Sequence, residues 1–122
     1  MDETPRPQEV LQRLMEVIED RRDHPPEKSY TTRLFSGGVP AIAGKITEEA
    51  AEVIEAAEEE GTEGRDHLIY EAADLVYHLM VMLGYKRIHW NEVESELGRR
   101  FGISGIDEKA SRQTASQPDP EH

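Results

Sequence analysis

The chain has 122 residues, with 14 basic and 26 acidic side chains and a formal net charge of −12 at pH 7. Such an acidic chain without a basic stripe is not expected to bind nucleic acid, because that affinity comes mostly from lysines and arginines that neutralise phosphates. The absence of cysteine excludes disulfides, thiolate metal sites and cysteine nucleophiles. The length suits one domain, and a hydrophobic share of 36% indicates a modest core, which favours burial of further surface by self-association.

Proline and glycine divide the first half of the sequence into helical segments. A first helix is expected to start at Thr4 and Pro5 and to stop at His24, before two prolines. Residues 27–38 are polar and rich in turn-forming residues, so we expect a loop there. A second helix should begin near Pro40 and run to about residue 60, with a glycine closing its C-terminal end.

The second half continues the helical pattern, and no strand-like alternation is present. We expect a third helix at about 64–85 and a fourth at about 90–102, where Trp90 and its apolar neighbours recur at helical spacing. Ser104 should open a short fifth segment, since an acidic residue follows three positions later, as in a capping box. The predicted fold is an all-α bundle of four to five helices.

The ends of the chain have little to bury. We expect residues 1–7 to form a flexible N-terminus, 8–112 the domain, and 113–122 a disordered tail rich in serine, proline and acids. No charged segment followed by an apolar run is visible at the N-terminus, which argues against a signal peptide. The longest apolar stretch, residues 75–85, is too short to span a bilayer, so we expect a soluble, cytoplasmic protein without a membrane partner.

The acidic excess is concentrated between residues 48 and 74, where eleven carboxylates stand against one arginine. Most of these acids are explained as the solvated face of a helix. Glu49 is an exception, because at ~100° per residue it falls among the apolar side chains of the second helix. Glu52 lies at the edge of that apolar arc beside Lys45, and Glu48 projects further out.

The third helix is apolar over most of its circumference, and the ionisable side chains along its middle fall in one narrow stripe. These residues are His67, Glu71, Asp74 and His78. If the stripe faces the Glu49 and Glu52 edge of the second helix, at least four carboxylates converge in a partly desolvated cleft. Such a cluster requires protonation or a counter-charge.

A divalent cation supplies that counter-charge better than the few bases nearby. Oxygen ligation without cysteine favours Mg²⁺ or Mn²⁺, which binds carboxylates together with substrate phosphates and so points to phosphoryl chemistry. The alternative is a salt-bridge network between the two helices, which we disfavour because acids outnumber bases there. Taken singly, His67 and His78 are each better explained as core histidines than as ligands. An alternative for Lys45 is a simple i,i+4 pair with Glu49, although lysine preceding glutamate is the weaker orientation.

Two other motifs fit poorly. The sequence of residues 38–47 partly matches the motif of a phosphate-binding loop, but its glycine spacing is wrong and no strand precedes it. A di-iron helical bundle would require Glu-x-x-His pairs, whereas this chain carries Glu49-x-x-Glu52 and Glu71-x-x-Asp74.

The spacing EEAAE at 48–52 and EAAD at 71–74 resembles the EExxE…ExxD signature of the all-α, MazG-type nucleoside triphosphate pyrophosphohydrolases. Within that superfamily the chain resembles the phosphoribosyl-ATP pyrophosphohydrolase family of histidine biosynthesis over residues 8–112. The narrower likeness is carried by SYTTRL at 29–34, KITEEAAEVIE at 45–55, EAADLVYHL at 71–79 and SGIDEKASR at 104–112.

The resemblance implies a dimeric MazG-like fold and Mg²⁺-dependent hydrolysis of phosphoribosyl-ATP to phosphoribosyl-AMP and pyrophosphate, with the water attacking in line at the α phosphorus. It implies that Glu49, Glu52, Glu71 and Asp74 hold the metal. Glu48 matches the first acid of the motif, either as a ligand or to position the water. For substrate binding we consider Arg33, Lys45, Lys109 and Arg112, each of which is also explained as an ordinary surface charge.

Two alternatives remain open at the level of the sequence. One is a housecleaning hydrolase of the same superfamily that acts on free (deoxy)nucleoside triphosphates. The other is a non-enzymatic helical module that a metal ion stabilises.

Overall fold

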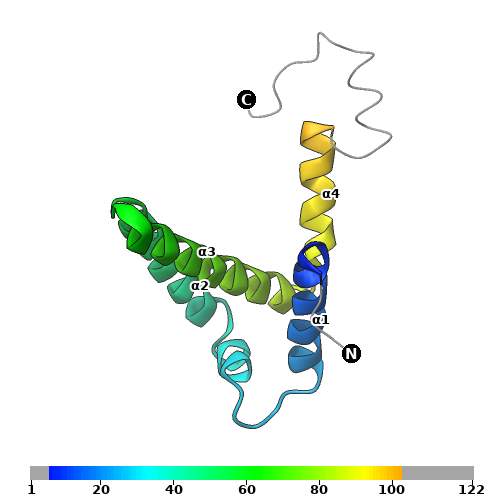
Figure 1. Cartoon of the computed structure of the whole chain (residues 1–122). Coiled ribbons are helices and arrows are strands. Elements are labelled where there is room, and N and C mark those ends of the chain that lie inside the picture. Colours follow the sequence, from blue (N-terminus) through cyan, green and yellow to red (C-terminus); the bar gives the residue numbers. More distant parts are fainter. Residues whose placement is uncertain (1–5, 103–122) are drawn as a thin grey trace. The chain divides into compact units, whose positions relative to one another are not determined.

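The computed structural model describes residues 6–102, which contain helices and no strand, as predicted (Figure 1). The chain divides into two units, one up to Ile88 and one from His89, each of which is described by itself. The predicted fifth segment at Ser104 lies outside the described residues, and the predicted domain limits remain a prediction. Within 6–102, no helix combines the length and apolarity needed to cross a bilayer.

The first unit opens with a short 3-10 turn, η1 (Pro7–Glu9), which leads into α1 (Val10–Asp23). Met15 and Ile18 of α1 are fully buried, as expected for an amphipathic helix that packs on one side. The helix ends at Asp23 with His24 as its C-cap residue, where the following prolines predicted the stop.

The next helix, α2 (Tyr30–Ala57), starts much earlier than predicted. The expected loop at 27–38 was wrong for most of its length, because Ser29 caps a helix whose Thr31 and Leu34 are buried. The Ser29 hydroxyl accepts a hydrogen bond from the Thr32 amide at 3.3 Å. Burial and capping therefore outweigh the turn-forming composition of the segment.

A kink at Gly38 divides α2 into two helical segments. Gly38 has φ 68° and ψ −162°, a backbone conformation that is essentially restricted to glycine. A Cβ atom at this position would also lie 3.2 Å from the Tyr85 hydroxyl oxygen. Pro40 starts the second segment, where its missing N–H costs nothing.

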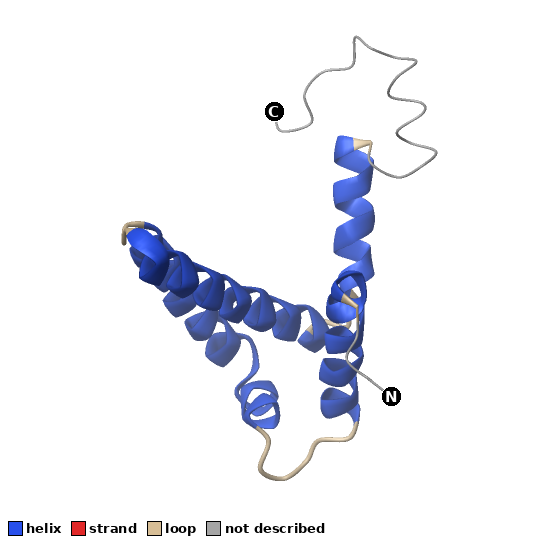
Figure 2. Cartoon of the chain, in the orientation of Figure 1, coloured by secondary structure: helices blue, strands red, loops and turns tan. Residues whose placement is uncertain are grey.

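The third helix, α3 (Gly61–Tyr85), runs back along the second segment of α2 after a short connection (Figure 2). Gly84 near its end packs closely on α1, where a Cβ atom would lie 2.9 Å from Ile18 Cγ2. The buried apolar side chains of the unit are Met15, Ile18, Leu34, Ile42, Ala56, Met80 and Val81. These side chains come from α1, α2 and α3, so this small core joins all three helices.

The second unit contains α4 (Trp90–Phe101), which matches the predicted fourth helix. His89 caps its start, with Nδ1 accepting from the Asn91 amide and the His89 amide donating to Glu92. Gly102 ends the helix in a left-handed conformation, with φ 60° and ψ 33°.

Candidate functional site

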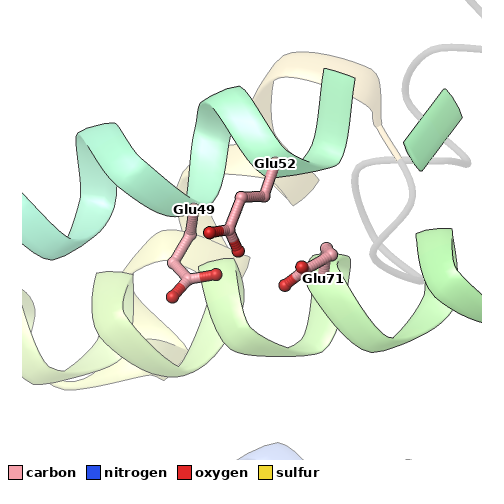
Figure 3. A group of neighbouring side chains, drawn as sticks. All are labelled: Glu49, Glu52 and Glu71. Carbon is pink, nitrogen blue, oxygen red and sulfur yellow. The ribbon is translucent and has the colours of Figure 1, made fainter. Parts of the chain in front are cut away.

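Three carboxylates meet between α2 and α3, as the helical spacing predicted. Glu49 and Glu52 on α2 face Glu71 on α3, and one oxygen atom from each lies within 4.8 Å of the other two (Figure 3). Glu49 and Glu71 are 7% and 6% exposed, whereas Glu52 is half-buried. The group therefore has a closed inner side and one member at its edge.

Two oxygen atoms of this group are buried without any hydrogen-bond partner, Glu49 Oε2 and Glu71 Oε1. Buried acceptors are rarely left unpaired, because their desolvation is then uncompensated. Burial raises the pKa of Glu49 to about 7, helped by the negative charges of Asp74, Glu52 and Glu71. The site is thus short of positive charge when no cation occupies it.

Glu48 does not join the group. Its carboxylate lies 3.6 Å from Lys45 Nζ, and its side chain is 54% exposed, so it follows the outward direction predicted for it. Lys45 therefore pairs with Glu48, three residues on, rather than with Glu49 as the alternative interpretation had it.

Asp74 lies one helical turn beyond Glu71 and is not one of the three converging acids. Its negative charge is the second-largest cause of the raised Glu49 pKa, after burial. Three of the four predicted acids thus form the close group, and the membership of Asp74 stays a prediction.

His67 is in contact with two carboxylates, a role that the sequence did not suggest. Its Nδ1 lies 2.9 Å from Glu59 Oε2, and its Nε2 lies 3.2 Å from Glu71 Oε2. The hydrogen bond to Glu59 is the largest cause that raises the pKa of His67 above its usual value. The negative charge of Glu59 and the contact with Glu71 raise it further. The ring is half-buried rather than in the core, contrary to the simpler interpretation.

His78 is a satisfied core histidine, as predicted. Its Nδ1 lies 2.9 Å from the Asp74 carbonyl, which only accepts, so Nδ1 carries the proton. In the neutral ring Nε2 is then an acceptor, and the Tyr30 hydroxyl donates to it at 2.7 Å. The Thr31 and Tyr77 hydroxyls form a further hydrogen bond between α2 and α3. These contacts hold the first segment of α2 against α3 at the buried side of the helix pair.

The predicted basic residues are less tightly placed. Arg33 is exposed, with its guanidinium carbon 5.9 Å from the centre of the Tyr30 ring. Lys109 and Arg112 lie outside the described residues. Within residues 6–102, the ionisable base that directly contacts the three-acid group is therefore His67.

The donor set fits a hard divalent cation. Carboxylate oxygens converge from two helices, two of their buried oxygen atoms have no partner, and the chain has no thiolate that would favour a softer metal. Glu49, Glu52 and Glu71 are the residues that would hold such an ion, with Asp74 next to them. A cation there would also interact with phosphate oxygens, which an acidic protein otherwise repels.

Comparison with known proteins agrees with this chemistry. The phosphoribosyl-ATP pyrophosphohydrolase family model matches residues 11–101. A phosphoribosyl-ATP pyrophosphatase of Rhodopirellula baltica is 54% identical over 102 residues, which cover 84% of this chain and 85% of that protein. Proteins of the same name from Geobacter sulfurreducens and Dechloromonas aromatica are 49% and 46% identical, over 85% and 87% of this chain and 94% and 95% of their own. The chain belongs to the phosphoribosyl-ATP pyrophosphohydrolase family.

Proposed function

We propose that this protein hydrolyses phosphoribosyl-ATP to phosphoribosyl-AMP and pyrophosphate in histidine biosynthesis, and that it uses Mg²⁺, or Mn²⁺ in its place. The observation that carries the proposal is the convergence of Glu49, Glu52 and Glu71 in a member of this family. An acidic protein repels a triphosphate substrate unless a cation lies between them, and these three acids are placed to hold such a cation. A biosynthetic step on a phosphorylated metabolite also favours the predicted cytoplasmic location.

The buried and the exposed acids have different roles in this proposal. Glu49, Glu52 and Glu71 would hold a divalent ion, which would supply polarisation of phosphoryl oxygens and positive charge to offset that of the leaving pyrophosphate. The buried Glu49 and Glu71 keep their carboxylates away from bulk water, which strengthens their electrostatic interactions. Glu48 is exposed and lies outside the group that would hold the ion, so we assign it the proton of the attacking water.

The basic residues near the site bind the substrate's negative groups in this proposal. The Lys45 ammonium group lies near the Glu48 carboxylate. Arg33 is exposed, with its guanidinium group over the Tyr30 ring. We assign phosphate contacts to both residues, and to Lys109 and Arg112 from the C-terminal part of the chain. An arginine donates two parallel hydrogen bonds to a phosphate, whereas a lysine acts as a point charge.

A substrate panel tests the activity. Purified protein with Mg²⁺ should release pyrophosphate from phosphoribosyl-ATP faster than from ATP, dCTP or dUTP, by ~10²-fold in kcat/KM, because the site must recognise the added ribose 5-phosphate. Faster turnover of dCTP or dUTP would instead identify a housecleaning hydrolase. Cleavage of no triphosphate, together with a chelator-induced loss of thermal stability, would indicate the non-enzymatic module.

We also propose that the protein acts as a homodimer. Several large apolar side chains on α2 and α3 remain exposed, among them Ile54 at 63%, Ile69 at 55% and Tyr70 at 66%. A core this small gains from burying such surface against a second copy. Light scattering on the eluting protein should give about twice the chain mass of 13.9 kDa, and a mass equal to that of one chain would contradict the proposal.

A further inference from the structure

His67 is held between two carboxylates that belong to different parts of the helix pair. Its Nδ1 contacts Glu59, which follows the end of α2, and its Nε2 contacts Glu71, one turn further along α3. With both ring nitrogens engaged, no lone pair of His67 is left for a metal ion. The contact to Glu71 is therefore to be explained by what it does to that carboxylate.

The contact divides the two oxygens of Glu71 between different partners. Oε2 accepts from His67 at 3.2 Å, whereas Oε1 is buried and has no partner among the described residues. Figure 3 shows the Glu71 carboxylate directed towards Glu49 and Glu52. A carboxylate with one oxygen held in this way loses the freedom to turn about its last torsion, so its other oxygen stays directed at the group.

Glu59 in turn fixes the imidazole ring, and the backbone around it is tightly packed. Gly64 is buried, and a Cβ atom there would lie 2.5 Å from the Glu59 carbonyl oxygen. The connection after α2 thus lies so close to the first turn of α3 that only glycine fits at position 64. Glu59 and His67 are held at a set separation by this close approach.

We propose that His67 is a positioning residue: it donates to Glu71 Oε2 and so presents Glu71 Oε1 to the divalent cation, while Glu59 orients the ring. The inference rests on the proposed function, because it requires a cation at the three-acid group. Hydrogen bonds to ligating carboxylates are a general means of orienting them, and their loss commonly weakens metal affinity by ~10- to 100-fold.

The test is titration of the full chain with MnCl₂, with free and bound Mn²⁺ measured by electron paramagnetic resonance. His67→Leu removes the donor, and His67→Gln keeps an N–H that reaches the same oxygen. Both substitutions remove any charge on the ring equally, so the difference between them isolates the hydrogen bond. We expect the leucine variant to bind Mn²⁺ ~10-fold more weakly and the glutamine variant within ~3-fold of the original protein.

Glu59→Ala should weaken Mn²⁺ binding several-fold, and Glu58→Ala is its matched control, with the same loss of charge one residue away. Equal affinities of the leucine and glutamine variants, or tighter binding by the leucine variant, would overturn the positioning role alone. Absence of any saturable Mn²⁺ binding by the original protein would overturn the cation site and this inference with it. Circular dichroism of each variant checks that helical content is kept.

Discussion

Replacing Glu49 with glutamine should lower the turnover of phosphoribosyl-ATP by on the order of 10³-fold, because the proposed cation would lose a ligand and with it several kcal/mol of charge stabilisation. Glu71→Gln and Asp74→Asn should have comparable effects. Pyrophosphate release at saturating Mg²⁺ measures the loss, and circular dichroism should show unchanged helical content. Near-original activity in any two of these three variants would remove the assignment of the site.

The same Glu49 substitution should stabilise the metal-free protein. The pKa of Glu49 is about 7 in the folded chain and near 4.5 when exposed, so the folded state binds the proton more tightly. Stability contributed by protonated Glu49 is therefore present at low pH and lost as the pH rises from about 4.5 to about 7. One pKa unit corresponds to ~1.4 kcal/mol, so the shift of the Glu49 pKa sets an upper limit to the stability that is lost. Solvent at the open edge of the group reduces that loss to ~2 kcal/mol.

Urea unfolding in the presence of a chelator measures this effect. The free energy of unfolding of Glu49→Gln should equal that of the original protein at pH 4.5 and exceed it by ~2 kcal/mol at pH 8. A site kept for stability alone would show the opposite, with loss of stability and loss of activity together. The combination of inactivity with higher metal-free stability is what a cation site predicts.

Gly38→Ala should lower the free energy of unfolding by ~3 kcal/mol. The positive φ of this residue is strained for any side chain, and the added Cβ atom would crowd the Tyr85 hydroxyl at 3.2 Å. The kink also sets where the first segment of α2 meets α3, so the Tyr30–His78 and Thr31–Tyr77 hydrogen bonds should be disturbed. Urea unfolding followed by circular dichroism measures the change.

Gly44→Ala is the matched control on the same helix. Gly44 is exposed in the interior of the second segment, and nothing lies within 4 Å of the position its Cβ would take. Alanine there should raise the stability by ~1 kcal/mol through helix propensity. Destabilisation of both variants by a similar amount would contradict the special role of Gly38 and point to a general intolerance of α2.

The inward acids were predictable because helical periodicity decides which face a residue shares. Glu49 falls among apolar neighbours at 100° per residue, and Glu71 shares a stripe with His78, so their burial follows from spacing alone. The outward direction of Glu48 followed in the same way. What spacing cannot supply is the distance across the helix pair, which separates the close group of three acids from the neighbouring Asp74.

The start of α2 was not predictable from local composition. Threonines and paired glycines favour turns, yet Thr31 and Leu34 are buried against the rest of the unit, and this tertiary packing decides the conformation. Ser29 was the available signal, since a serine before such a segment is a common N-cap.

The bridge from Glu59 through His67 to Glu71 was hidden for a different reason. Glu59 lies beyond the end of α2, where helical periodicity no longer applies, and its place depends on the close packing of Gly64. No rule based on spacing within one helix relates a residue in a connection to a side chain on the next helix.

The three cation-directed acids all lie between residues 49 and 71, on either side of one short connection. Contacts between residues so near in sequence form at little cost in loop-closure entropy. The proposed cation site is therefore assembled within a single helical hairpin, so a nascent chain can form it once that hairpin has emerged.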